Sequence, residues 1–379
     1  MESTNTSSIE VTTRSDLSLL YKVLRTIIRP LRPRLVKPGK PAPSESQKLS
    51  PPEKRGCKVI ESRREGIWEY TFRHSSQPAS QGGQPLHDGV ARVVEERKPA
   101  SKKHRVYYFC GGGFQSPPSN EHWRFITQVT KDLAQSQGQH REVEITVVSH
   151  PLAPASPAAE ALPVLRKWLA SALVEANLAG DTVTLMGDSS GGNIALSLGF
   201  WAVENYKAPS ASATSGDGNG LPLVAVFVIS PAVDLRNVNP GIEEVDRYDP
   251  VLTVGLTSQV ARAWTGNVES KGPVPGKPAA MEMSNPTVSP LLQPEEMFRL
   301  MRDRGVSVHG VVGTHDVLAP DALEFMRKCE RFGVRGKWLV WDGQMHCFPL
   351  AGGGEIVGLR EGKEGRRWVD EVLREDARV

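Results

Sequence analysis

The chain has 379 residues, of which 39% are hydrophobic, and it carries a formal net charge of +3. Residues 1–60 hold 12 Lys and Arg against 5 Asp and Glu, so this segment carries +7 and the rest of the chain carries −4. The mildly acidic body argues against nucleic acid as the main substrate. The four cysteines form no CxxC pair, which argues against a zinc site or a disulfide scaffold and favours a reduced intracellular compartment.

The first 55 residues are predicted to form a basic arm ahead of an α/β domain over 56–379. We expect residues 1–15 to be disordered, 17–31 to form a helix with basic side chains between its apolar positions, and the Pro-rich stretch through Pro52 to be a linker. The helix has two interpretations: it lies on a membrane or beside an apolar entrance, or it packs on the body with a solvated basic side.

No apolar run approaches the roughly 18 residues of a membrane span, and no secretory signal is recognisable at the start of the chain. We therefore expect a cytoplasmic protein, in which residues 17–31 are the candidate for peripheral contact with an intracellular membrane.

Alternation of strand-like and helix-like runs predicts a parallel sheet with helices on both faces. Edge strands are expected at 59–62, 68–72 and 90–94, and further strands at 105–109, 143–149, 182–186, 223–229, 306–312 and 337–341. Helices are expected at 122–133, 158–176, 194–202 and 321–331, and a surface loop at 208–220. The stretch 234–294 breaks this rhythm and is predicted to cap the carboxyl edge of the sheet.

The most informative motif is Gly187-Asp-Ser-Ser-Gly-Gly-Asn193, which lies between a predicted strand and a predicted helix. A serine between glycines at such a turn is typical of a nucleophile elbow, in which the backbone thrusts the Ser189 hydroxyl into the open. A turn without chemistry is the alternative that this motif alone leaves open.

A serine nucleophile needs a base and an acid that orients the base. His346 and Asp316 each follow a predicted strand, and the chain order Ser189, Asp316, His346 is that of α/β hydrolases. Asp321 is the alternative acid, and His150 and His315 are the alternative bases.

The developing oxyanion needs fixed donors, and Cys110-Gly-Gly-Gly-Phe114 follows a predicted strand. Three glycines let the backbone turn its N–H groups into the site. The N–H of Ser190, directly after the nucleophile, is expected to be a further donor.

Together these motifs resemble the hormone-sensitive-lipase-like branch of the α/β hydrolases, the GDXG esterases, over roughly residues 100–350. Supporting matches are Pro151-Leu-Ala-Pro154, Ser230-Pro-Ala-Val-Asp-Leu235 and Asn285-Pro-Thr-Val-Ser-Pro-Leu291. Within the branch, the patterns look most similar to fungal steryl acetyl hydrolases.

The resemblance implies an α/β-hydrolase fold with a mostly parallel eight-stranded sheet flanked by helices. A cap would come from the amino-terminal segment and from an insertion after strand six, at about 234–294. It also implies that Gly112, Gly113 and Ser190 form the oxyanion hole, that Asp188 holds the elbow, and that neither cofactor nor metal is needed. Cys110 departs from the family, which usually has His there. This leaves open how the loop is held.

The residues and the resemblance predict a serine carboxylic-ester hydrolase whose substrate is a small hydrophobic ester. It is expected to remove a short, acetyl-like group from a hydrophobic alcohol or a pathway intermediate through an acyl-enzyme. An acyltransferase or transesterase with the same triad is the alternative. A non-catalytic ligand-binding protein on the same fold is a third hypothesis, although the receptors of this branch lose the histidine. A formamidase is a further alternative, and a peptidase fits the glycine loop less well.

Overall fold

The computed structural model describes residues 7–32, 43–52, 56–74, 102–135, 141–208, 220–267, 278–353 and 359–379. The strand expected at 90–94 and nearly all of the loop expected at 208–220 lie outside these residues. Within them, one sheet has nine strands in the order β1-β9-β8-β7-β6-β4-β5-β3-β2. The strands are β1 (Ile9–Arg14), β2 (Cys57–Arg64), β3 (Ile67–His74), β4 (Lys103–Phe109), β5 (Glu142–Ser149), β6 (Thr182–Asp188), β7 (Leu223–Ile229), β8 (Ser307–His315) and β9 (Gly336–Met345).

The sheet from β1 to β5 is parallel throughout, and β3 and β2 continue it as antiparallel strands at one edge. Successive side chains of the inner strands enter two different cores. On β4, for example, Tyr107 and Phe109 join one hydrophobic cluster, whereas Val106 and Tyr108 join the other. A strand buried on both faces has an almost continuous apolar sequence, which is why these strands were predictable.

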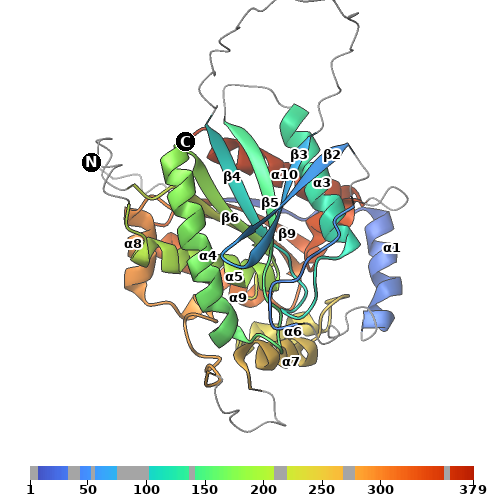
Figure 1. Cartoon of the computed structure of the whole chain (residues 1–379). Helices are drawn as coiled ribbons and strands as arrows, with labels where there is room; N and C mark the ends of the chain where they lie inside the picture. The colour runs from blue at the N-terminus through green and yellow to red at the C-terminus, as the bar shows by residue number, and fades with distance from the viewer. Residues whose placement is uncertain are drawn as a thin grey trace, which may run out of the picture.

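Helices cover both faces of the sheet, as Figure 1 shows. One core contains side chains of α4, α5, α8 and α9, and the other contains side chains of α1, α3 and α10. The helices are α1 (Leu19–Ile28), α3 (Asn120–Gln135), α4 (Ala158–Ala179), α5 (Ser190–Asn205), α6 (Gly241–Asp246), α7 (Val254–Thr265), α8 (Glu295–Asp303), α9 (Ala319–Arg331) and α10 (Arg360–Asp376), with 3-10 turns η1 (Arg29–Leu31), η3 (Pro290–Leu292) and η4 (Phe348–Gly353).

The described sheet has nine strands rather than the expected eight, and its first strand corrects the expectation of disorder for the described part of residues 1–15. Ile9–Arg14 forms β1, which pairs in parallel with β9 from Ile9 opposite Gly336 to Arg14 opposite Trp341. Ile9 is buried, whereas its neighbour Glu10 is exposed. A short strand at a sheet edge needs only one apolar face. For this reason the polar sequence of Ile9–Arg14 did not predict a strand.

The described part of the expected linker lies against the sheet. The backbone N–H of Trp68 donates to Ser46 Oγ at 2.9 Å, and Ser149 Oγ donates to the carbonyl of Gln47 at 2.7 Å. The helix expected at 17–31 is present as α1 followed by η1.

The insertion at 234–294 follows β7, which is the sixth strand once β1 is set aside. Its described part contains α6 and α7, which lie together at one end of the molecule in Figure 1, and η3. Among the described residues, no helix combines the length and the apolar character that a membrane crossing requires.

Candidate active site

Ser189 lies at a sharp turn between β6 and α5. Its φ of +53° is in the left-handed region that side chains rarely adopt, and its N–H donates to the carbonyl of Ile229 at 2.8 Å. A Cβ on Gly187 would collide with the backbone of Gly191, and a Cβ on Gly191 would collide with the carbonyl of Phe109. The two glycines are therefore required by the close approach of three backbone segments, and the strained turn is part of the site.

His346 and Asp316 meet at the carboxyl edge of the sheet, after β9 and β8. His346 Nδ1 is 2.8 Å from Asp316 Oδ2, and the Asp316 carboxyl group is fully buried. Burial alone would lower the pKa of His346, but the Asp316 carboxylate raises it well above the usual value. The contact also leaves Nε2 as the ring nitrogen that can accept a proton from the pocket.

A second buried carboxylate, Asp249 of the insertion, packs next to this pair. Its Oδ1 accepts from the N–H groups of Val251 and Leu252, and its Oδ2 accepts from Val317, the residue after Asp316. Burial, followed by the negative charge of Asp316, raises the pKa of Asp249 to about 6. Asp249 thus ties the cap to the loop that carries Asp316.

The glycine loop after β4 adopts backbone angles that only glycine takes easily. Gly112 and Gly113 have φ values of +135° and +61°, and both line the cavity that contains Ser189. The N–H of Ala153, in the Pro151–Pro154 motif, donates to the carbonyl of Phe114 at 2.8 Å and so holds the far side of this loop. Ser190 also lines the cavity, at the first position of α5.

Asp188, the neighbour of Ser189, holds the near side of the glycine loop. Its Oδ1 accepts from Gly111 N–H at 2.9 Å and from Tyr108 Oη at 2.7 Å, and its Oδ2 lies 3.2 Å from His122 Nε2. Burial alone would raise the pKa of Asp188, but the facing His122 and these hydrogen bonds lower it. A buried ionised Asp188 therefore anchors the loop, and the anchor involves backbone and neighbouring side chains rather than the residue at 110.

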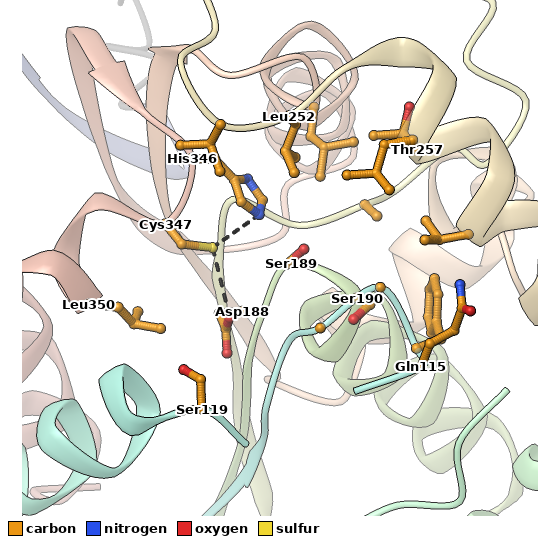
Figure 2. Close-up of a pocket in the computed structure, with 18 of the residues that line it drawn as sticks. Gln115, Ser119, Asp188, Ser189, Ser190, Leu252, Thr257, His346, Cys347 and Leu350 are labelled. Carbon is orange, nitrogen blue, oxygen red and sulfur yellow. Dashed lines mark hydrogen bonds between the residues drawn. The ribbon is translucent and has the colours of Figure 1, made fainter. Parts of the chain in front are cut away.

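The two cysteines of the site differ in position. Cys110 is fully buried in the core, and burial raises the pKa of its thiol well above the usual value. Cys347 lines the cavity, with Sγ 3.4 Å from His346 Nε2, as the dashed line in Figure 2 shows. Burial raises the pKa of Cys347 to about 11, so the thiol stays protonated at neutral pH.

Ser189 itself makes no hydrogen bond to His346 within this described site, and catalytic contacts of this kind are often loose before substrate binds.

Ser189, His346 and the glycine loop surround one cavity of about 420 Å³ (Figure 2). Much of its wall is apolar and comes from the cap and from η4. The apolar lining includes Phe114, Val251, Leu252, Leu256, Val260, Leu318, Leu350 and Ala351. In the described part of the chain, no group of three His, Cys, Asp or Glu side chains is placed to hold a metal ion.

Comparison with known protein families identifies the family to which this chain belongs. A family model described as "alpha/beta hydrolase fold" matches residues 106–350, which is more than half of the chain. The chain belongs to this α/β-hydrolase family. Among curated proteins, none matches the chain.

Solved structures of α/β hydrolases superpose over nearly the whole chain. Carboxyl esterase 2 from the mycorrhizal fungus Tuber melanosporum is 17% identical, covers 96% of this chain and 100% of its own, and has a TM-score of 0.63. The esterase EstE5 is 19% identical, with coverage of 95% and 99% and a TM-score of 0.63. A hormone-sensitive lipase from a metagenome library is 15% identical, with coverage of 93% and 92% and a TM-score of 0.59. At these identities the likeness establishes the fold.

The alternative site residues of this α/β hydrolase lie elsewhere. His150 is buried with its ring nitrogens toward the carbonyls of Pro151 and Cys110. His315 is the last residue of β8, directly before Asp316, but its Nδ1 lies 2.8 Å from the Arg25 guanidinium of α1. Asp321 lies in the first turn of α9, and its burial raises its pKa to about 7. None of the three lines the cavity that contains Ser189.

Sequence reasoning missed two residues of the site of this α/β hydrolase, Asp249 and His122. His122 lies in the first turn of α3 and receives a hydrogen bond on Nδ1 from the backbone N–H of Ser119 at 3.0 Å. Neither residue belongs to a short motif, because each reaches the site only through tertiary packing. The break in rhythm at 234–294 is the one sequence signal that pointed toward Asp249.

Proposed function

We propose that this protein is a serine carboxylic-ester hydrolase with Ser189, His346 and Asp316 as its catalytic residues. The observation that supports this most directly is the shared cavity. It holds a serine on a strained turn and an imidazole whose other nitrogen contacts a buried carboxylate, beside a glycine loop. The esterases among the solved relatives support the same reaction class.

In the proposed reaction, Ser189 Oγ attacks the ester carbonyl while His346 Nε2 takes its proton. For this step the ring exchanges its contact with the Cys347 thiol for one with Ser189. The Asp316 carboxylate stabilises the imidazolium that forms. The N–H groups of Gly112, Gly113 and Ser190 stabilise the charge that develops on the carbonyl oxygen.

His346 then gives the proton to the leaving alcohol, and the C–O bond breaks to leave an acyl group on Ser189. Water attacks this acyl-enzyme with His346 again as base. The carboxylic acid leaves, and the free serine is restored.

The substrate is proposed to be a small hydrophobic ester. The apolar lining of the cavity favours an apolar acyl or alcohol group over a charged one. The finer proposal is an acetyl-like acyl group on a hydrophobic alcohol, because the glycine-loop and Ser-x-Pro-Leu-Ala-Pro patterns resemble those of fungal steryl acetyl hydrolases.

Two measurements test the proposal. A fluorophosphonate probe is expected to label the wild type and not Ser189→Ala. Failure to label the folded wild type would contradict the assignment of the catalytic triad and favour a binding protein. A series of p-nitrophenyl esters from acetate to decanoate then measures acyl length. A sharp preference for acetate supports deacetylation, and a preference for decanoate overturns the acetyl proposal while leaving the esterase in place.

Product analysis separates hydrolysis from acyl transfer. Under hydrolysis, the free acid is the product whether or not an alcohol acceptor is added. Formation of a new ester at the expense of the acid would instead identify a transferase with the same residues.

A further inference from the structure

Helix α1 presents large apolar side chains to solvent. The exposed fractions are 78% for Leu19, 55% for Leu20, 49% for Val23, 59% for Ile27 and 45% for Leu31 in η1. These are five of the twelve exposed large hydrophobic side chains in the described part of the chain. Scattered single side chains of this kind are ordinary, but five on one short helix form a continuous surface. We call these five residues the apolar ridge.

Packing of α1 on the body does not account for the ridge. The side of α1 that faces the core is formed by Tyr21, which is buried, and by the partly buried Leu24 and Ile28. At 100° per residue, the ridge residues occupy the neighbouring arc of the helix, away from that core-facing side. The helix packs on the body and exposes Lys22 and Arg29, but its outward surface also carries the apolar ridge.

Basic side chains border the apolar ridge along one edge. At 100° per residue, Lys22, Arg25 and Arg29 occupy the arc between Leu19 and the core-facing side, and no Asp or Glu occurs between Leu19 and Arg32. Arg25 and Arg29, with Thr26, Pro30 and Tyr248, line a second hollow of about 490 Å³ beside the helix. An apolar helix surface bordered by cations of the same helix, which itself has no acidic residue, is complementary to a layer of acyl chains under anionic headgroups.

We propose that α1 and η1 dock on an anionic lipid surface, with the apolar ridge inserted among the acyl chains and Lys22 and Arg29 against the headgroups. The α1 helix is about 15 Å long, so it lies along the surface and does not cross it. In Figure 1, α1 stands at the side of the molecule, where such a surface can reach it.

The docked helix is attached to the cap of the candidate active site. Arg32, directly after η1, donates to the carbonyl of Asp249 at 2.9 Å and forms an ion pair with Asp246 at 2.5 Å. The carboxylate of Asp249 in turn accepts from Val317, beside Asp316. Docking therefore places the cap next to the lipid, and an ester dissolved in the bilayer is brought close to the cavity. Only this last consequence depends on the proposed function.

Vesicle co-sedimentation with the full chain tests the proposal. We expect binding to vesicles of phosphatidylcholine and phosphatidylserine, weak binding to phosphatidylcholine alone, and release at high salt. The double variant Leu20→Gln, Ile27→Gln is expected to lower the partition coefficient at least about tenfold, because two exposed apolar side chains no longer insert. Lys22→Gln, Arg29→Gln is expected to abolish the preference for anionic vesicles.

A matched control keeps the experiment specific. Val174 and Leu178 are exposed by 36% and 66% on α4, so Val174→Gln, Leu178→Gln makes the same exchange on another helix and is expected to leave binding unchanged. Turnover of a water-soluble p-nitrophenyl ester is expected to be equal in all these variants, which shows that they fold. If neither the wild type nor any variant turns over esters, the proposed function is wrong. Vesicle binding still tests the proposed docking of α1 in that case.

Three outcomes would overturn the proposal. The wild type fails to bind anionic vesicles, or the ridge variant binds as well as the wild type. In the third, sedimentation velocity shows a dimer that Leu20→Gln, Ile27→Gln converts to a monomer, in which case the ridge is an interface between two copies of the chain.

Discussion

The elbow with its glycine loop and the cap over it are built on different principles. In the elbow, Gly187 and Gly191 have no space for even one additional carbon, because backbone meets backbone. In the cap, the cavity wall consists of side chains such as Leu252 and Val260 on α7 and the segment before it. We therefore expect the position of Ser189 and the glycine loop to depend on backbone geometry, and the proposed choice of substrate to depend on exchangeable side chains.

The largest effects are expected at the proposed catalytic residues. Ser189→Ala and His346→Ala are each expected to lower kcat by about 10⁴-fold or more, and by similar factors, because a triad acts as a unit. The measurement is hydrolysis of p-nitrophenyl butyrate. Thermal unfolding of the same variants serves as a control, and a wild-type rate in either variant would contradict the assignment.

Gly191→Ala tests the backbone side of the comparison. The added methyl group would collide with the carbonyl of Phe109, so we expect a loss of stability of about 3 kcal/mol or more, or no soluble protein. Chemical denaturation measures the loss. Gly305→Ala is a matched comparison because nothing lies near its Cβ position, although its positive φ adds strain.

Asp316→Asn is expected to reduce kcat less than loss of the serine does and to move its pH dependence. The Asp316 carboxylate raises the pKa of His346, and only the neutral imidazole accepts a proton. Wild-type activity should therefore fall as the pH drops through a midpoint above about 6.5, and this midpoint should move down in Asp316→Asn. If Asp321→Asn were inactive and Asp316→Asn near wild type, the acid would be Asp321.

The cap side of the comparison is tested at Leu252 and Val260. Their replacement by Ala enlarges the cavity at the pocket wall, and we expect the preference for longer over shorter acyl esters to rise about tenfold in kcat/KM. Fluorophosphonate labelling of Ser189 should stay unchanged. An equal loss for all chain lengths would place these residues in the reaction rather than in its selectivity.

The smallest effects are expected at the cysteines. Cys110→Ser should keep most activity, because Asp188 and backbone contacts hold the glycine loop. The protonated Cys347 thiol should react slowly with alkylating reagents, since its pKa is about 11. Rapid and complete inactivation by iodoacetamide, absent in Cys347→Ser, would contradict this expectation.

The sequence predicted the inner strands, the turn at Ser189 and the proximity of His346 to Asp316, because each depends on local patterns and on parallel strands ending at one edge. It did not predict β1, whose polar residues suit an edge, or the contacts of Asp249 and His122 with the site. The sequence also did not predict which apolar side chains of α1 are exposed. Helical spacing of apolar residues does not show which of them pack against the core and which face solvent. Such features depend on which distant segments pack together.

The pairing of β1 with β9 has a consequence for how the protein is handled. β9 leads directly to His346, and without β1 it would be the outermost strand, with unpaired backbone groups open to other chains. The segment Ile9–Arg14 covers that edge with a short strand that carries the charged side chains Glu10 and Arg14. We therefore expect a protein expressed from a gene shortened at its 5′ end, and so lacking β1, to aggregate through the exposed edge of β9. Such a sample would be lost before its activity could be assayed.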